Sequence, residues 1–323
     1  MSLELVSYGA FFLTMALTFA IICLGLNVQW GQTGLFNVGV AGFVAAGAYV
    51  SALLTTPEDA ARLGGFGMPI AAGWLGGALA SAALSFMVGA LTIRLRADYL
   101  AIATFGVAVV VQLCALNLEA VTGGPFGVGF IPRPFAGTAR NPLSFGLLNL
   151  GLLAALVAML YLLVERLTRS PWGRVLRAVR EDEAAALALG KNASRLRLQA
   201  FALGGGMMGL AGAVQAHFIG FIAPDNYMPM LTFQVWAMLI VGGSGNNRGA
   251  ILGAVLVWAI WAGSAALIST LFPPAEQARA AALQIVLIGV ALCGVLLLRP
   301  RGIMGEEQIV SRHVGKPHKA GAP

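Results

Sequence analysis

The stretch RAVREDEAAALALGKN, residues 177–192, is dense in charge although the rest of the chain is apolar. Of the 323 residues, 59% are apolar and 10% are charged. Residues 165–197 nevertheless hold eight Lys/Arg and four Asp/Glu, which is twelve of the 33 charged residues (20 basic plus 13 acidic). This concentration predicts one water-facing element within a chain that otherwise avoids water.

The composition of the whole chain indicates its class. A soluble domain carries charge on about a quarter of its residues, whereas this chain has a tenth and a mean hydropathy of +0.84. The 42 glycines suit a membrane bundle, since small residues let helix backbones approach closely. We therefore predict an all-α, polytopic integral membrane protein.

The apolar runs give a count of spans, because a spanning helix needs about 20 mainly apolar residues. The candidate spans are residues 8–28, 35–54, 69–91, 99–118, 147–164, 198–218, 231–241, 250–271 and 281–298. The prediction is nine spans, within a range of about 8–10, because 231–241 is short and GQTGLFNVGVAGF (31–43) is broken by glycine. The first span has no basic segment or cleavage site before it, so we expect it to be retained.

Basic residues are unevenly shared between the two sides of the predicted bundle. The regions that follow odd-numbered spans, together with the tail, hold sixteen Lys/Arg, and the opposite side holds four. Since loops rich in Lys/Arg stay in the cytoplasm, we expect the charged stretch and the C-terminus there. Nine spans then leave the N-terminus outside. The same asymmetry accounts for the net charge of +7 without a nucleic-acid partner.

The charged stretch carries the signals of an amphipathic helix. Ser170 and Pro171 suit the N-cap and N1 positions, and Gly190 suits the stop. An apolar stripe runs between them: Val175, Leu176, Val179, Ala186 and Leu187. Such a helix lies at the membrane face and fits a groove in a soluble partner. A solvated loop is the alternative.

Residues 119–145, EAVTGGPFGVGFIPRPFAGTARNPLSF, form the longest predicted external loop. Its glycines and prolines exclude a long helix. A docking or gating surface and a disordered spacer are both compatible with this composition.

Polar side chains within apolar spans are costly and mark either a route or a helix contact. The candidates for the translocation pathway are Asn27, Gln32, Asn37, Gln112 and Asn117. For each one singly, a hydrogen bond between helices is the more common role. The first three lie among glycines, and Gly-interrupted helices expose backbone only against protein or water-filled cavities. A second Gly/Asn-rich break, GGSGNNRGAILGAVL (242–256), is a candidate counterpart in an inverted repeat.

Several function classes are excluded by missing motifs. The three cysteines lie in apolar runs without pairing, and no metal-ligand, catalytic or phosphate-loop motif occurs. We therefore expect no enzyme activity, no metal and no cofactor on this chain. No carboxylate lies deep in a span, which argues against a carrier driven by protons or sodium.

Several segments together resemble a known family. Glu183-Ala184-Ala185 followed by Gly190 resembles the cytoplasmic EAA loop of ABC-importer permeases, with four intervening residues instead of three and without the usual later proline. Five ordered segments resemble LivM-type permeases of branched-chain amino acid importers: residues 25–54, 94–106 (RLRADYLAIATFG), 122–128 (TGGPFGV), 177–204 and 239–254. The resemblance covers residues 8–304, the permease domain, and leaves 305–323 as a polar cytoplasmic tail.

The resemblance implies residue roles. Contacts to the ATPase would be made by Arg177, Arg180, Glu181, Asp182, Glu183, Ala184, Ala185 and Gly190. The external-loop residues that match the family are Thr122, Gly123 and Gly124.

The resemblance also implies a function. The chain would be one permease subunit of a bacterial inner-membrane importer of leucine, isoleucine and valine. Its partners would be membrane lipid, a second homologous permease, two subunits that bind ATP and Mg, and a periplasmic solute-binding protein. Uptake of urea, amides or aromatic acids by the same architecture is the first alternative. An ATP-independent carrier or channel is the second.

Overall fold

The computed structural model describes residues 2–58, 63–95, 97–138 and 141–271, together with scattered positions between 273 and 306. Within these residues the structure is helical, and its only extended pairing is an isolated antiparallel bridge between Val128 and Ile222. The principal helices are α1 (Ser2–Leu26), α2 (Val40–Thr55), α3 (Ile70–Thr92), α4 (Ala97–Asn117), α5 (Glu119–Thr122), α6 (Pro142–Arg169), α7 (Pro171–Glu181), α8 (Glu183–Ala188), α9 (Ala193–Ile219), α10 (Pro229–Gly242) and α11 (Asn247–Leu271). Four short elements join them: the π-helical turn η1 (Asn27–Gly31) and the 3-10 turns η2 (Gly124–Phe126), η3 (Ala136–Thr138) and η4 (Pro224–Tyr227).

The first eight predicted spans coincide with helices α1, α2, α3, α4, α6, α9, α10 and α11. Among the described residues, five helices are long and apolar enough to cross a membrane, namely α1, α3, α4, α6 and α11. Helices α2 and α10 are apolar but shorter. The ninth predicted span, 281–298, lies largely outside the described residues, as does the tail from 307 onward. The count of nine therefore stays a prediction.

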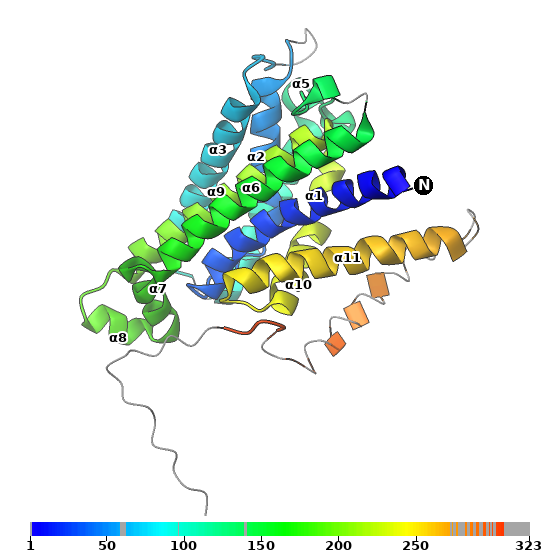
Figure 1. Ribbon diagram of the computed structural model, residues 1–323. Helices are drawn as coiled ribbons and strands as arrows, with labels where there is room; N and C mark the ends of the chain where they lie inside the picture. Colours follow the sequence, from blue (N-terminus) through cyan, green and yellow to red (C-terminus); the bar gives the residue numbers. More distant parts are fainter. Residues whose placement is uncertain are drawn as a thin grey trace, which may run out of the picture.

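Helix α9 lies at the centre of the bundle and packs against α1, α2 and α3 (Figure 1). Glycines make this packing close: a Cβ at Gly209 of α9 would overlap Ser81 of α3, and one at Gly47 of α2 would overlap the Gly209 backbone. Ser81 uses the short distance to bridge three helices, since its Oγ bonds the carbonyls of Phe43 (2.9 Å) and Gly205 (2.8 Å). The high glycine content is thus used at helix crossings.

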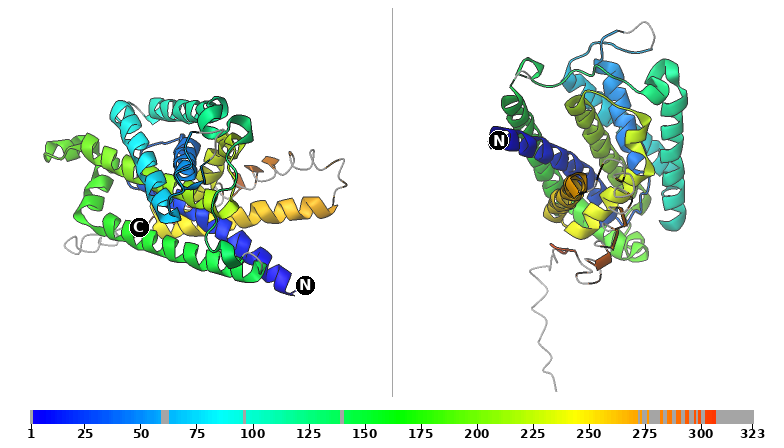
Figure 2. Two further views of the ribbon diagram at one scale, coloured as in Figure 1. Left: turned by 90° about the horizontal axis from the view of Figure 1, so that it is seen from above. Right: turned by 90° about the vertical axis from the view of Figure 1, so that its right-hand side faces the viewer.

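The remaining helices cover two opposite faces of this centre. Helices α6 and α11 pack on α1, and the N-terminal end of α1 and helix α4 lie on opposite sides of the bundle (Figure 2). We name the two ends of the bundle the α7 end and the α5 end (Figure 1). At the α7 end, Ile303 and Met304 donate backbone hydrogen bonds to Val241 (2.9 Å) and Gly242 (3.0 Å).

Candidate functional site

The charged stretch folds as two helices, α7 and α8, so the expectation of one continuous helix is wrong. The break falls at Asp182, whose backbone is extended (φ −149°, ψ 100°). Its Oδ1 accepts a hydrogen bond from the backbone N–H of Ala185 at 3.0 Å, which caps α8. A capping aspartate offers the backbone an alternative to the helical bond, which is the physical reason for the break.

The ends of the pair follow the sequence signals. Ser170 precedes Pro171 at the start of α7 as predicted, although its hydroxyl bonds the Leu167 carbonyl (2.6 Å) instead of capping the helix. Gly190 follows the C-cap of α8 with φ +72°, a left-handed conformation that favours glycine. The N–H groups of Gly190 and Lys191 bond the carbonyls of Leu187 (2.9 Å) and Ala186 (3.1 Å), which is a Schellman motif.

One face of α7 is turned into the protein. Leu176 and Val179 are buried there, and Ala186 of α8 is buried with Val179 against the start of α9. The predicted apolar stripe is therefore confirmed except at Leu187, which is 53% exposed. The pair is therefore packed on the bundle along one face.

Arg177 and Arg180 also point inward, to the break after α1. Arg180 Nη1 donates to the carbonyl of Gly31, and its Nη2 pairs with Glu306 at 2.7 Å. Arg177 donates to Gln32 Oε1 (3.4 Å) and to the Thr168 carbonyl (3.2 Å). The two residues expected to touch a partner thus tie α7 to the first span.

The surroundings of the two arginines differ electrostatically. Burial lowers the pKa of Arg177. Burial also acts against the charge of Arg180, but the hydrogen bonds that it donates to the carboxylates of Glu306 and Glu181, with their charges, outweigh burial and raise the pKa of this guanidinium. Arg180 is therefore the better compensated of the two charges.

The outer face of the α7–α8 pair, which we name the α7–α8 corner, is exposed to solvent. The exposed members of the predicted docking set are Glu181, Asp182, Glu183, Ala184, Ala185 and Gly190. Glu183 pairs with Arg197 of α9 at 2.7 Å. Leu189 is 77% exposed, so that with Leu187 the surface offers two apolar side chains beside a group of carboxylates. This exposed surface therefore combines apolar and acidic side chains.

The amides of the first break form a buried network. Residues Asn27, Gln32 and Asn37 lie in or beside η1 and are all buried. Asn37 Nδ2 donates to Gln29 Oε1 (2.7 Å), and Gln29 Nε2 donates to the Phe201 carbonyl of α9 (2.8 Å). Each of these buried amides thus has a hydrogen-bond partner, which the apolar side chains around the π-helical turn could not provide.

The two Gly/Asn-rich breaks meet at this network. Asn27 donates to Asn247 Oδ1 (2.9 Å) and accepts from the Gly245 N–H (2.8 Å). Gln32 Nε2 donates to the Gly245 carbonyl at 3.2 Å. A Cβ at Gly31 would overlap the backbone of Gly245, and Gly245 itself has a φ of +86°, which favours glycine. Contact between the segments says nothing about an inverted repeat, which stays a prediction.

Sequence reasoning missed four partners of these residues: Gln29, Glu165, Asn247 and Glu306. Asn247 donates to Glu165 Oε2 at 2.7 Å, which connects the second break to α6. Gln29 lies between Asn27 and Gln32, and its polar character was the available signal. Pairings such as Arg180 with Glu306 span 126 residues, and no local pattern reports them.

Two predicted pathway residues lie apart from the network. Gln112 and Asn117 belong to the second half of α4, toward the α5 end, and the exposed Asn117 donates to the carbonyl of Leu113 in its own helix (2.7 Å). The structure brings Asn27, Gln32 and Asn37 together with Arg177 and Arg180, and leaves these two outside.

In the loop that the sequence predicts to be external, residues 119–138 form defined turns. Thr122 Oγ1 lies within hydrogen-bond distance of two carbonyl oxygens, those of Ala115 (2.7 Å) and Leu118 (2.8 Å), and so stabilises the turn after α4. Gly123 and Gly124 follow with φ values of +74° and +57°. The bridge between Val128 and Ile222 then fastens the loop to the segment after α9. The predicted TGG residues thus form a turn at the α5 end.

Known proteins are similar to this chain over most of its length. The model of the family described as branched-chain amino acid transport system / permease component matches residues 9–296. The chain is 36% identical to the high-affinity branched-chain amino acid transport system permease protein LivM of Salmonella typhimurium over 270 residues, 76% of this chain and 60% of that protein. It is 29% identical to the probable LivM permease of Methanocaldococcus jannaschii, over 73% of this chain and 75% of that protein.

A second type of permease is also similar. LivH of Salmonella typhimurium, likewise a high-affinity branched-chain amino acid transport system permease protein, is 24% identical over 92% of this chain and 94% of its own length. No solved structure matched the chain. The family match extends from within α1 across α11, and so includes both breaks and the α7–α8 corner. The chain therefore belongs to the family of permease components of branched-chain amino acid transport systems.

Proposed function

We propose that this chain is a membrane permease subunit of a bacterial ATP-driven importer of leucine, isoleucine and valine. The observation that carries the proposal is the family match across residues 9–296, supported by the names of the similar LivM and LivH permeases. Because the chain spans 60% of the length of the Salmonella LivM protein, activity, substrate and partners are all part of the proposal.

The proposed assembly follows from the similar proteins and from the exposed corner. A second, LivH-like permease would lie beside this chain in the inner membrane, and a periplasmic binding protein would dock at the α5 end. Two subunits that bind ATP and Mg would dock from the cytoplasm, where the C-terminus also lies. The exposed residues of α8 would touch an ATP-binding subunit, while Arg177 and Arg180 would pass its movement to the first span. Such a device needs a rigid packed contact with two arrangements.

Within the membrane, a route for the substrate fits the region of the first break. Buried amides with fixed partners leave little free hydrogen-bonding capacity, which suits weak contact with a passing amino acid. Asn27, Gln32 and Asn37 remain the proposed pathway residues. Their present hydrogen bonds would exchange as α7 moves.

The test is uptake of labelled leucine by cells that lack this chain and by cells that have it restored. We expect uptake to be lost without the chain, restored with it, and unaffected by excess urea or benzoate. Competition by urea or benzoate would instead assign the permease to amides or aromatic acids. Uptake that persists after ATP depletion would favour a carrier and contradict the proposal.

A further inference from the structure

Residues 302–306, which we name the C-terminal strap, lie on the turn between α10 and α11 at the α7 end (Figure 1). The N–H of Ile303 donates to the Val241 carbonyl at 2.9 Å. The N–H of Met304 donates to the Gly242 carbonyl at 3.0 Å. These two carbonyls belong to the last two residues of α10, where the helix itself supplies no donor. The strap therefore caps the C-terminal end of α10.

Asn246, in the turn between the two helices, connects the strap to α11. Its Nδ2 donates to the carbonyls of Met304 (3.0 Å) and Gly305 (3.1 Å). Its Oδ1 accepts hydrogen bonds from the N–H groups of Arg248 (2.9 Å) and Gly249 (3.2 Å), in the first turn of α11. One side chain thus caps α11 and binds the strap.

Two glycines allow the strap to lie close to this turn. Gly302 has a φ of +73°, and a Cβ there would lie 2.6 Å from the Cα of Gly243. Gly245 has a φ of +86°, and a Cβ there would lie 2.9 Å from Cδ of Glu306. A positive φ favours glycine at both positions. The backbone of the strap therefore packs directly against the second break.

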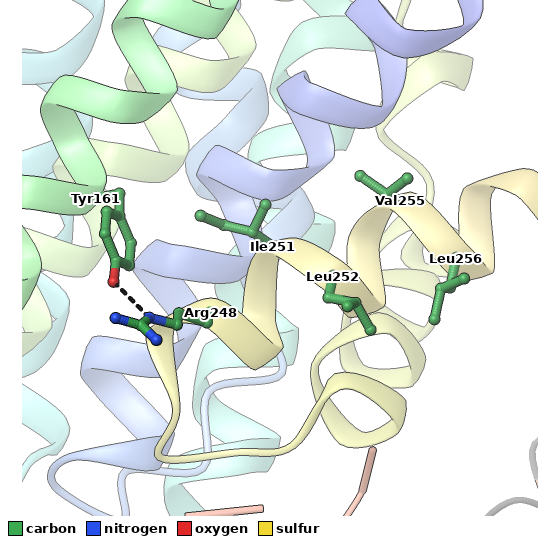
Figure 3. Close-up of a pocket in the computed structure, with 6 residues that line it drawn as sticks. All are labelled: Tyr161, Arg248, Ile251, Leu252, Val255 and Leu256. Carbon is green, nitrogen blue, oxygen red and sulfur yellow. Dashed lines mark hydrogen bonds between the residues drawn. The ribbon is translucent and has the colours of Figure 1, made fainter. Parts of the chain in front are cut away.

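The beginning of α11 is also fixed to α6. Arg248 Nε donates to Tyr161 Oη at 3.1 Å, as the dashed line in Figure 3 shows. Asn247 Nδ2 donates to Glu165 Oε2 at 2.7 Å. The turn that carries the strap is thus held by side chains of α6, so a displacement of the strap acts on packed helices instead of on a free loop.

Glu306 connects the strap to α7. Its Oε1 lies 2.7 Å from Nη2 of Arg180, and the two side chains are 37% and 20% exposed. The same guanidinium pairs with the neighbouring Glu181 at 2.6 Å, and its Nη1 donates to the Gly31 carbonyl of the first break. The pair with Glu181 stays within α7, whereas the pair with Glu306 joins residues 126 positions apart. Arg180 therefore connects α7 both to the first break and to the strap.

We propose that Glu306 is a positioning residue for transport, and that the strap is a second route by which movement of the α7–α8 corner reaches the membrane helices. The inference rests on the proposed function, in which an ATP-binding subunit moves this corner. Arg180 passes the movement to the first break at Gly31, and Glu306 passes it through the strap to the turn between α10 and α11. The two breaks then shift together, because tightly packed elements move as units.

The first experiment reconstitutes the complete complex with its binding protein into vesicles, and measures leucine uptake and ATP hydrolysis in the same preparation. Glu306→Gln keeps the size of the side chain and removes its charge, while Arg180 keeps its bonds to Gly31 and Glu181. We expect ATP hydrolysis to continue and the leucine carried per ATP to fall about fivefold, the lower end of typical coupling between sites.

The matched control is Asp98→Asn, which removes an exposed carboxylate at the start of α4 and should leave this ratio unchanged. An unchanged ratio in Glu306→Gln, whether or not both rates fall, would overturn the proposal. A melting temperature that falls together with ATP hydrolysis would show a contact needed for stability alone, which would also overturn the positioning role.

Hydrogen exchange tests the contact without any substrate. The bonded N–H groups of Ile303 and Met304 should be protected in the wild-type complex and should lose protection in Glu306→Gln. Arg180→Gln should cause the same loss, and the double variant no larger one, because both changes break one contact. Unchanged protection in Glu306→Gln, or losses that add in the double variant, would contradict the route through Arg180.

The two experiments separate failure of this proposal from failure of the proposed function. A wild-type complex that carries no leucine contradicts the proposed function. Protection of Ile303 and Met304 that does not respond to Glu306→Gln contradicts the strap, whatever substrate is carried.

Discussion

Gly47 shows how a single residue sets the distance between two helices. A Cβ at this position would overlap the backbone of Gly209 in α9, whereas a Cβ at Gly151 on α6 meets nothing within 4 Å. Overpacking a tight contact costs about 1–3 kcal/mol. Glycine at the first position is therefore required by α9, and glycine at the second is not required by any neighbour within that distance.

We expect Gly47→Leu to lower the melting temperature of the purified protein clearly, by the equivalent of about 2–3 kcal/mol. The same substitution at Gly151 should leave it nearly unchanged. Thermal denaturation in one detergent checks both variants side by side. Equal melting temperatures would show that α2 and α9 do not pack as closely as described.

A substitution at Asn27 tests whether this buried amide has a structural role. Its Nδ2 and Oδ1 are both bonded, to Asn247 and to the Gly245 N–H. Asn27→Leu would leave these buried groups without a partner, at a cost of about 1–3 kcal/mol each. We expect reduced stability and reduced uptake together. Asn117→Leu, on the exposed part of α4, serves as the control. Loss of uptake in an Asn27→Leu variant of unchanged stability would contradict the structural role of this amide and leave only its proposed place on the substrate route.

The α7–α8 corner is the element that an ATP-binding subunit would contact. Its inner face is anchored by Leu176 and Val179, and its outer face exposes Leu187 and Leu189. Glu183 is a poor single probe, because its pairing with Arg197 at 2.7 Å means that Glu183→Arg would place two like charges together. Exposed leucines can be changed without breaking an ion pair.

Leu187→Asp should abolish uptake and weaken copurification of the ATP-binding subunit, while insertion into the membrane stays normal. Loss of a central docking residue costs about 2 kcal/mol, roughly thirtyfold in affinity. Ser194→Asp adds the same charge to an exposed position in the first turn of α9 and should be tolerated. Normal uptake by Leu187→Asp would remove α8 from the docking surface.

At the scale of the molecule, the two ends of the bundle differ in chemistry. The α7 end carries the charged corner and residues 302–306, and the α5 end carries the ordered loop with Phe126 at 87% exposure. If the α7 end faces the cytoplasm, the two ends should react with a membrane-impermeant reagent from opposite sides.

Single cysteines test this orientation. In a background with Cys114 and Cys293 replaced by serine, we expect Phe126→Cys to react with an impermeant maleimide in spheroplasts. Leu189→Cys should react only after the membrane is opened. Labelling of Leu189→Cys in sealed spheroplasts would reverse the topology.

The sequence by itself determined the membrane class, the positions of eight helices, the start of α7 and the glycine stop of α8. These features depend on local composition, since an apolar run of sufficient length or a glycine with positive φ acts where it stands. Only three of the five predicted pathway residues, Asn27, Gln32 and Asn37, lie together in the structure. A polar residue in an apolar span indicates that burial must be compensated, but it does not indicate which group compensates it.

Only the tertiary structure decided that Arg177 and Arg180 face inward, that Asp182 divides the charged helix, and that the breaks near Gly31 and Gly245 touch. Each of these outcomes depends on partners far away in the chain: Gly31 for Arg180, Asn247 for Asn27 and Arg197 for Glu183. A buried donor takes whatever acceptor the packed helices bring within about 3 Å. That choice is made by the arrangement of the bundle, which no local pattern contains.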